Sequence, residues 1–517
     1  MHNALLAAAI VSTLYATTVT AAAPSTCEYI RGEPIPLQIQ GWYSRPVLEG
    51  KINSLTVPML VDTGAAYTLI KARSIELLQL PARLQRGGAA GLGGLTRRSF
   101  TTAVSEFSVG NTKPIRANFP VAAMSQHDVF GAVLGVDFLL QADLEIDFAA
   151  HRLQFNRLGN CSKDTVLLPN AAVLDAPVDA SDPRPHFYVN VNAVPVRTLI
   201  DTGAPYSLID IHAARRAGIT PSMPGAMERT PVTGAGEGSL AAWIVPVSEM
   251  GIGKDTHKNL KITLTTVNHN TADPRGTEMI LGTDFLASHR VLFSRSQGKV
   301  YLENKAPLKL ITSIADRVEW LEIDAAQGNP GAMAHLAMRL ENGEGIAQDT
   351  ARAAKLRETA GAKGDFKTRL QKANQQLSDG EFAIAAPALR QLAQSVSSSR
   401  YTELEAYIAT ALNGETHTAQ EELKIFLKRA NDESWPTPIM EFLAGESSAS
   451  SLLKTARKDE GRANSRECEA HYYIAQAARL KGDRGAARQS FESALAICPA
   501  SGFEHRASTT ALKQTEL

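Results

Sequence analysis

The chain has 517 residues, of which 44% are hydrophobic and 21% are charged. A domain usually takes about 100–200 residues, so this length predicts three or so compact units. Fifty-three basic side chains balance fifty-three acidic ones. This composition excludes a collagen, a disordered tail and a polytopic membrane protein, and it gives no overall charge that would draw the protein to nucleic acid.

The first 23 residues are predicted to be a secretory signal rather than part of the fold. An apolar stretch begins at Leu5, and small residues follow it and end in Ala21-Ala22-Ala23. A short apolar segment before an A-x-A site is typical of a cleaved signal peptide, although a buried N-terminal helix is the alternative. We expect residues 1–23 to be removed and the protein to be exported, periplasmic or secreted, with no transmembrane span.

Four cysteines agree with an oxidising compartment. They form no C-x-x-C motif and have no histidine spaced for zinc, so we expect no metal site. An even number of cysteines suggests two disulfides, and four cysteines allow three pairings. Closeness along the chain favours Cys27–Cys161 and Cys468–Cys498.

Three short blocks recur in the same order within the first 305 residues. DTGAAYTLI (62–70) returns as DTGAPYSLI (201–209), VSEFSVG (104–110) as VSEMGIG (247–253), and AVLGVDFLL (132–140) as MILGTDFLA (279–287). Recurrence at nearly constant separation indicates two copies of one unit of about 140 residues. We place the two copies, which we call lobe 1 and lobe 2, at residues 24–165 and 166–305.

Each lobe is expected to be rich in β-strands and to contain a hairpin with a glycine-rich tip. The hairpins are predicted at residues 87–98 and 233–242. Glycine lowers the cost of bending, so we expect these hairpins to be mobile covers over a cleft, with ordinary exposed turns as the alternative. The tip glycines are Gly91, Gly93, Gly94, Gly234, Gly236 and Gly238.

The two Asp-Thr-Gly turns carry the chemistry. If the lobes pack about a pseudo-two-fold axis, Asp62 and Asp201 face each other across it. Two adjacent carboxyls cannot both ionise cheaply and therefore share one proton. The ionised carboxylate can then activate a water as general base, while the protonated carboxyl polarises a carbonyl as general acid.

At these residues the sequence resembles the retropepsin-like aspartic proteases, over about residues 35–305. The resemblance rests on the duplicated Asp-Thr-Gly-Ala turn and on a hydrophobic-hydrophobic-Gly segment in each lobe. It implies two all-β lobes in one monomeric chain that hydrolyses a peptide or protein substrate without a cofactor. It also implies that each Asp is catalytic, that the next Thr bonds across to the other lobe, and that a later Gly packs behind each turn. The residues at these positions are Asp62, Thr63, Gly64, Ala65 and Gly135 in lobe 1, and Asp201, Thr202, Gly203, Ala204 and Gly282 in lobe 2.

The sequence also departs from the family. Retroviral members often carry a substrate-binding Asp where Ala66 and Pro205 stand here, and neither hairpin has the flap Tyr of pepsin-like enzymes. Tyr67 and Tyr206 recur after the two turns; they either line the cleft or, as we favour, pack in the core. Pepsin-like enzymes usually place Ser or Thr at the positions of Ala65 and Ala204. Without those hydroxyls the dyad should titrate higher, which predicts activity at about pH 4.5–6.5.

Residues 306–517 are predicted to be helical. Residues 328–356 resemble a Sel1-type repeat and residues 470–501 a tetratricopeptide repeat, which implies an all-α solenoid. Such a surface usually binds a peptide or protein partner, and a stabilising appendage is the alternative. The fold class is therefore multidomain. The function we favour is an exported aspartic endopeptidase, and the alternative is an inactive exported scaffold that binds peptides or partner proteins.

Overall fold

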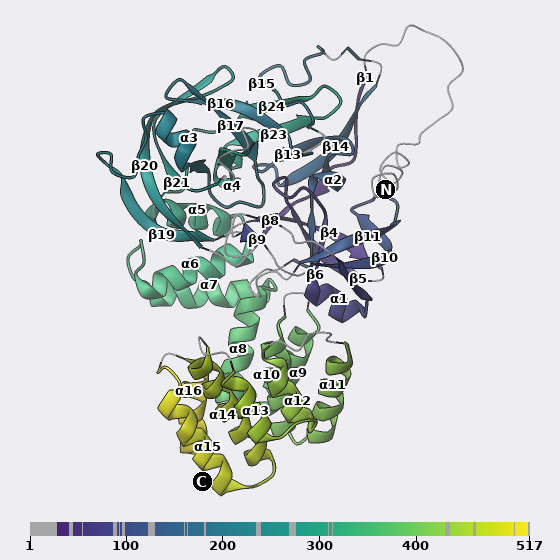
Figure 1. Ribbon diagram of the computed structural model, residues 1–517, viewed down its shortest axis with the longest axis vertical. Helices are drawn as coiled ribbons and strands as arrows, with labels where there is room; N and C mark the ends of the chain where they lie inside the picture. Colours follow the sequence, from purple (N-terminus) through teal and green to yellow (C-terminus); the bar gives the residue numbers. More distant parts are fainter. Residues whose placement is uncertain are drawn as a thin grey trace. The chain divides into compact units, whose positions relative to one another are not determined.

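The computed structural model describes the chain with several gaps (Figure 1). The residues described are 28–40, 45–53, 55–85, 90–91, 94–95, 99–122, 130–159, 161–162, 164–179, 182–233, 239–267, 276–308, 310–312, 314–395, 398–429, 435–458, 462–500 and 502–514. The predicted signal segment, 1–23, lies outside them. The chain divides into two compact units, Met1–Lys363 and Gly364–Leu517.

Lobe 1 is built from strands and two short helices. These are β1 (Glu28–Arg31), β2 (Ile35–Pro36), β3 (Gln38–Gln40), β4 (Arg45–Ile52), β5 (Leu55–Val61), β6 (Leu69–Lys71), α1 (Ala72–Leu78), β7 (Ala82–Gln85), β8 (Ala90–Gly91), β9 (Gly94–Leu95), β10 (Ser99–Val109), β11 (Ile115–Ala122), β12 (Ala132–Leu134), α2 (Val136–Leu139), β13 (Asp143–Asp147) and β14 (Arg152–Gly159).

Lobe 2 repeats this plan. Its elements are β15 (Ala172–Asp175), β16 (His186–Val191), β17 (Val194–Ile200), β18 (Leu208–Asp210), α3 (Ile211–Arg216), β19 (Met227–Thr233), β20 (Ser239–Ile252), β21 (Asp255–Thr265), β22 (Met279–Leu281), α4 (Thr283–Leu286), β23 (His289–Ser294) and β24 (Lys299–Asn304). The predicted lobe boundary at 165/166 falls between β14 and β15.

The sequence repeat corresponds to a repeat of sheet topology. The main sheet of lobe 1 has the order β4-β5-β12-β6-β11-β10-β7, with β3 beside β4, and that of lobe 2 has the order β16-β17-β22-β18-β21-β20-β19. In both, the strand that ends at the Asp-Thr-Gly turn pairs in parallel with the strand of the hydrophobic-hydrophobic-Gly segment. These sheets confirm the prediction of two all-β lobes.

A third sheet joins the lobes, with the order β1-β14-β13-β23-β24-β15 (Figure 1). At the junction β13 and β23 pair antiparallel, with Leu144 opposite Phe293 and Ile146 opposite Val291. All four of these side chains are buried. Apolar burial and a hydrogen-bonded ladder therefore connect the two lobes directly.

Three helices follow the lobes within the first compact unit: α5 (Ile314–Ala326), α6 (Pro330–Asn342) and α7 (Thr350–Ala362). Asn329 caps α6 by accepting from the N–H groups of Gly331 and Ala332, and Gly343 ends it with φ of 68°. The backbone N–H of Ile311, just before α5, donates to Asp284 of lobe 2 at 3.1 Å. Nε2 of His151 in lobe 1 lies 3.0 Å from Oε1 of Gln327, the residue that follows α5.

The second compact unit is helical. Its helices are α8 (Phe366–Ser378), α9 (Phe382–Ala393), α10 (Arg400–Leu412), α11 (Thr416–Arg429), α12 (Thr437–Ala444), α13 (Ala449–Ala456), α14 (Ala463–Leu480), α15 (Arg484–Ile497) and α16 (Phe503–Gln514). Helices adjacent in sequence pack against each other, which fits a helical-repeat arrangement.

A disulfide joins Cys468 on α14 to Cys498 at the end of α15, the pair favoured from the sequence. Cys161 is also disulfide-bonded, and Cys27, its predicted partner, lies outside the described residues. Within the part of the chain that the structure describes, no helix has the length and apolar character needed to cross a membrane. No cluster of potential metal ligands is found among the same residues.

Candidate active site

The two Asp-Thr-Gly turns begin where a buried strand ends. Asp62 follows β5, and its backbone N–H donates to the carbonyl oxygen of Leu134 on β12 at 3.0 Å. Asp201 follows β17 and donates in the same way to Leu281 on β22 at 2.9 Å. Each aspartate is therefore held at the end of a parallel strand pair in its own lobe.

The structure brings the two carboxyl groups together. The carboxyl groups of Asp62 and Asp201 are close enough to act on each other's pKa, and each lies against the glycine of the opposite turn. The Oδ1 of Asp62 also accepts from the N–H of Gly64 at 2.9 Å and of Ala65 at 3.0 Å. Gly203 and Ala204 donate to the Oδ1 of Asp201 at 2.8 and 3.1 Å. Backbone donors thus fix one oxygen of each carboxyl group, and the carboxyl groups meet across the lobes.

The glycines of the turns are needed for this approach. A Cβ placed on Gly64 would lie 2.3 Å from a carboxyl oxygen of Asp201, and one on Gly203 would lie 2.5 Å from a carboxyl oxygen of Asp62. Any side chain there would push the opposite carboxyl away.

The threonines of the turns cross between the lobes. The Oγ1 of Thr63 donates to the carbonyl oxygen of Ile200 at 2.6 Å and accepts from the N–H of Thr202 at 3.2 Å. The Oγ1 of Thr202 makes the reciprocal bonds to Val61, at 2.6 Å, and from Thr63, at 3.0 Å. Both threonines are fully buried. These reciprocal hydrogen bonds fix the two turns relative to each other.

Gly135 and Gly282 lie directly behind the turns. A Cβ on Gly135 would lie 2.4 Å from the backbone of Tyr67, and one on Gly282 would lie 2.7 Å from the backbone of Tyr206. The backbone N–H of each glycine donates at 3.1 Å to a hydroxyl in the turn segment, Thr68 in lobe 1 and Ser207 in lobe 2.

Sequence reasoning missed the partners of these hydroxyls. Thr68 donates to Asp137 at 2.7 Å, and Ser207 donates to Asp284 at 2.7 Å. The signal was present, because the Thr/Ser exchange after the turn and the Asp after each Leu-Gly occur in both repeats.

Burial governs the electrostatics of the dyad. It raises the pKa of both carboxyl groups above the ordinary aspartate value, and the charge of Asp201 raises the pKa of Asp62 further. The positive charges of Arg45 and Arg184 act in the opposite direction, on the pKa of Asp62 and Asp201 respectively. The net effect raises both pKa values, so the pair retains a proton at pH values where an exposed aspartate is ionised.

The two tyrosines after the turns differ from the favoured interpretation. Tyr67 is 60% exposed, so its assignment to the core is wrong. Tyr206 is partly buried, and the guanidinium of Arg229 on β19 lies 5.1 Å from its ring centroid. The sequence repeat predicts the same environment for both tyrosines, whereas among the described residues a guanidinium, from β19, is found over Tyr206 alone.

Both glycine-rich hairpins form. In lobe 1, β7 pairs with β10 and β8 with β9, where Gly91 lies opposite Gly94; in lobe 2, β19 pairs with β20 up to Thr233 opposite Ser239. Gly93, Gly234, Gly236 and Gly238 lie outside the described residues. The predicted cover role therefore stays a prediction.

Comparisons with known proteins agree with this geometry. Residues 48–141 match the family model of the gag-polyprotein putative aspartyl protease, and residues 187–285 match that of the aspartyl protease. Among solved structures, an aspartic proteinase from Irpex lacteus is similar, at 14% identity and a TM-score of 0.34, over 53% of this chain and 97% of that one. A search of curated proteins finds no match. The duplicated family match and the paired turns show that the two lobes of this chain belong to the retropepsin-like aspartic proteases.

Proposed function

We propose that the protein is an exported aspartic endopeptidase that hydrolyses peptide bonds with a water activated between Asp62 and Asp201. The observation that carries this proposal is the meeting of two carboxyl groups across the lobes. Each carboxyl group is held by the equivalent backbone donors of its own turn. Both turns are intact, which favours an enzyme over an inactive scaffold.

The raised pKa values support a dyad that shares one proton. In the proposed reaction the ionised carboxylate removes a proton from the water while the water oxygen attacks the peptide carbonyl carbon. The protonated carboxyl group donates to the carbonyl oxygen, which gives a gem-diol. One carboxyl group then donates a proton to the amide nitrogen while the other carboxylate takes a proton from a gem-diol hydroxyl. The C–N bond breaks, the two products are a carboxylic acid and an amine, and the dyad again holds one proton.

The supporting residues fit this chemistry. The bonds of Thr63 and Thr202 keep the distance between the turns constant, so the dyad needs little rearrangement during the reaction. Because both turns lie in one chain, a monomer suffices for catalysis. We assign the role of cleft covers to the two glycine-rich hairpins, because glycines such as Gly91 and Gly94 lower the cost of bending.

Export and a partner-binding role for the helical unit are part of the proposal. The apolar segment before Ala23 supports export, and the Cys468–Cys498 disulfide suits an oxidising compartment. We assign the helical repeats to binding a protein partner: the Sel1-like segment on α6 and α7, and the α8–α16 unit with its tetratricopeptide-like segment.

The test is incubation of the mature protein with a denatured protein, with and without a statine-type inhibitor. We expect inhibitor-sensitive cleavage. Asp62→Asn and Asp201→Asn should each lower kcat/KM by about 10²–10⁴-fold or more, because each removes one half of an acid–base pair. Asp164→Asn changes an exposed carboxylate and is the matched control, with unchanged rates expected. Near-normal cleavage by either dyad variant would contradict the paired mechanism, and a wild type without cleavage would favour the scaffold.

A further inference from the structure

Arg184 lies beside the dyad although it is outside the Asp-Thr-Gly-Ala turns. Its Nη1 donates to the carbonyl oxygen of Gly64, in the catalytic turn of the other lobe, at 3.3 Å. Gly64 in turn lies against the carboxyl group of Asp201. A positive charge from lobe 2 is therefore placed next to the turn of lobe 1 and close to both aspartates.

Asp182 holds the guanidinium of Arg184 in this place. Nε of Arg184 donates to Oδ1 of Asp182 at 2.8 Å, and Nη2 donates to Oδ2 at 2.6 Å. This two-point contact fixes the plane of the guanidinium. Both side chains are half-buried, so solvent screens the charges only in part.

The arginine recurs in lobe 1. Arg45-Pro46 precedes Asp62 by as many residues as Arg184-Pro185 precedes Asp201. In the ladders, Val47 lies opposite Leu60 and His186 lies opposite Leu199. Continuing either register by two residues places the arginine opposite the aspartate of its own lobe.

Among the residues that the structure describes, the charges that act on the dyad come from Arg45 and Arg184, with the carboxylate of Asp182 behind Arg184. Arg184 lowers the pKa of Asp201 against the raising effect of burial. Burial alone would lower the pKa of Arg184, but Asp182, and after it Asp201 and Asp62, raise it above its ordinary value. His186, which follows closely in sequence, has a pKa lowered to about 4 by burial and by Arg197, so it carries no charge near neutral pH.

We propose that Arg184, held by Asp182, is a positioning residue of the dyad. It supports the Gly64 turn from the opposite lobe, and its charge keeps the pair singly ionised at acidic pH values where the pair alone would take up a second proton. This inference rests on the proposed proteolytic function, because its effect is read in the pH dependence of cleavage.

The test compares the acid limb of the kcat/KM–pH profile in four variants. Arg184→Met should move the acid limb upward by about half to one pH unit, because a nearby cation is lost. Asp182→Asn removes the counter-charge but keeps an amide oxygen that accepts from the guanidinium, so the cation stays in place and the acid limb should move downward. Arg184→Lys keeps the charge and should stay within a few tenths of a unit of wild type. Arg215→Met changes an exposed arginine on α3 and should leave the acid limb where it is in the wild type.

A raised KM with an unmoved acid limb in Arg184→Met would overturn the proposal, because Arg184 would then act on the substrate. If Arg184→Met does not fold, Asp182→Asn alone decides, and an unmoved or upward limb overturns the proposal. If the wild type does not cleave, the proposed function fails separately. In that case ¹³C NMR of aspartate carboxyl groups, assigned with Asp62→Asn, still measures the dyad; a lower midpoint in Asp182→Asn supports the role, and an unchanged one overturns it.

Discussion

At the scale of single residues, the alanines after Asp-Thr-Gly leave the dyad without a hydroxyl donor from its own turns. Ala65 packs beside Leu60, Phe130 and Val133, and Ala204 packs beside the matching apolar cluster of lobe 2. Neither alanine offers a hydroxyl, so the carboxylates accept only N–H groups from their own turns. With fewer donors to the charged form, burial outweighs the backbone donors and the nearby arginines, and the pKa values of the pair are raised.

The first prediction at this scale concerns the pH range of activity. Ala65→Ser with Ala204→Ser should move the pH–rate profile toward acid, because a hydroxyl donating to a carboxylate favours its charged form. The profile of purified wild type and double variant is the measurement, with about pH 4.5–6.5 expected for the wild type. A wild-type optimum below about pH 3.5, or no acid shift in the variant, would show that this position does not set the range.

The second prediction concerns stability. In the folded state the dyad has raised pKa values, so it binds more protons than the unfolded chain does once the pH exceeds the ordinary aspartate value of about 4. Its contribution to stability is therefore full below that pH and is lost as the pH rises through the folded-state values. Melting curves should show the wild type losing more stability than Asp62→Asn between about pH 4 and pH 7.5, because in this interval the unfolded chain loses its proton before the folded pair does. Parallel losses in the two proteins would contradict the raised values.

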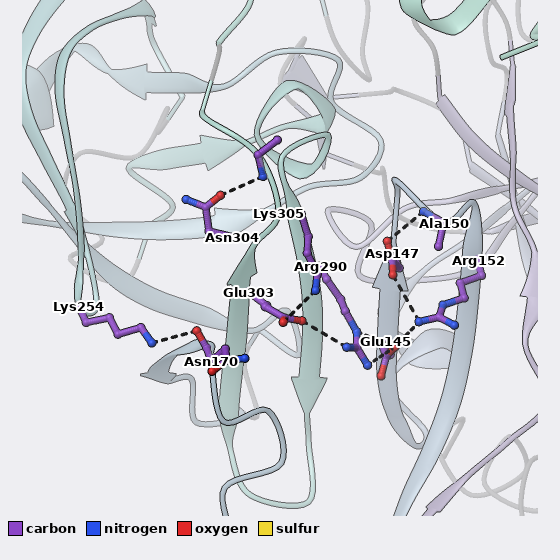
Figure 2. A network of polar contacts seen from close by, with 11 residues as sticks. Glu145, Asp147, Ala150, Arg152, Asn170, Lys254, Arg290, Glu303, Asn304 and Lys305 are labelled. Carbon is purple, nitrogen blue, oxygen red and sulfur yellow. Dashed lines mark hydrogen bonds and ion pairs between the residues drawn. The ribbon is translucent and has the colours of Figure 1, made fainter.

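At the scale of elements, the sheet that joins the lobes contains a buried ion pair between them. Glu145 on β13 of lobe 1 is 1% exposed and accepts from Nε of Arg290 on β23 of lobe 2 at 2.9 Å (Figure 2). Arg290 also contacts Glu303 at 3.2 Å, and Arg152 contacts Asp147 at 3.4 Å. Removing one partner of such a pair leaves a desolvated charge beside the apolar ladder.

Glu145→Gln should therefore lower the free energy of unfolding by about 3 kcal/mol, measured by urea denaturation. Glu145→Leu with Arg290→Leu should recover most of that loss, because both charges are removed together. Lys258→Gln breaks an exposed pair with Glu249 and is the control, with a change within about 0.5 kcal/mol. Equal effects of the buried and exposed variants would mean that the pair does not stabilise the lobe junction.

Sequence reasoning reached the parts of the site that repeat locally. The turns, the glycines behind them and the hairpins are short patterns whose conformation depends on neighbours in sequence. It missed Arg184, the Glu145–Arg290 pair and the exposure of Tyr67, because each depends on which side chain a distant strand supplies. The sequence predicts a helical region from residue 306, and α5 begins at Ile314. The inclusion of α5 with the lobes in one compact unit depends on long-range contacts, which the sequence does not reveal.

At the scale of the whole molecule, Asp284 connects the catalytic lobe to the chain that leads into the helices. Its Oδ1 accepts from Ser207 Oγ and from the N–H of Phe285, and its Oδ2 accepts from the N–H groups of Ser207 and Ile311. The same carboxylate thus holds the segment behind the Asp201 turn and the start of the helical region.

Asp284→Asn should destabilise the first unit by about 1–3 kcal/mol. Both carboxylate oxygens accept hydrogen bonds, so the amide NH₂ that replaces one of them must face hydrogen-bond donors. Asp137→Asn is the matched variant in lobe 1, where both bonds from Thr68 end on Oδ1 and an amide oxygen can accept them. Hydrogen exchange at the Ile311 amide should speed up in Asp284→Asn and stay unchanged in Asp137→Asn. Equal exchange in the two variants would mean that this bond does not fasten the helices to lobe 2.

The difference between the two tyrosines has a consequence for how a peptide lies in the site. In a site built from two identical halves, a peptide and the same peptide turned end to end make equal contacts, so both orientations have the same energy. Here Tyr67 presents an open ring on one side, whereas Tyr206 on the other carries the guanidinium of Arg229. If a peptide binds across the two turns as proposed, its two orientations therefore make different contacts in this chain.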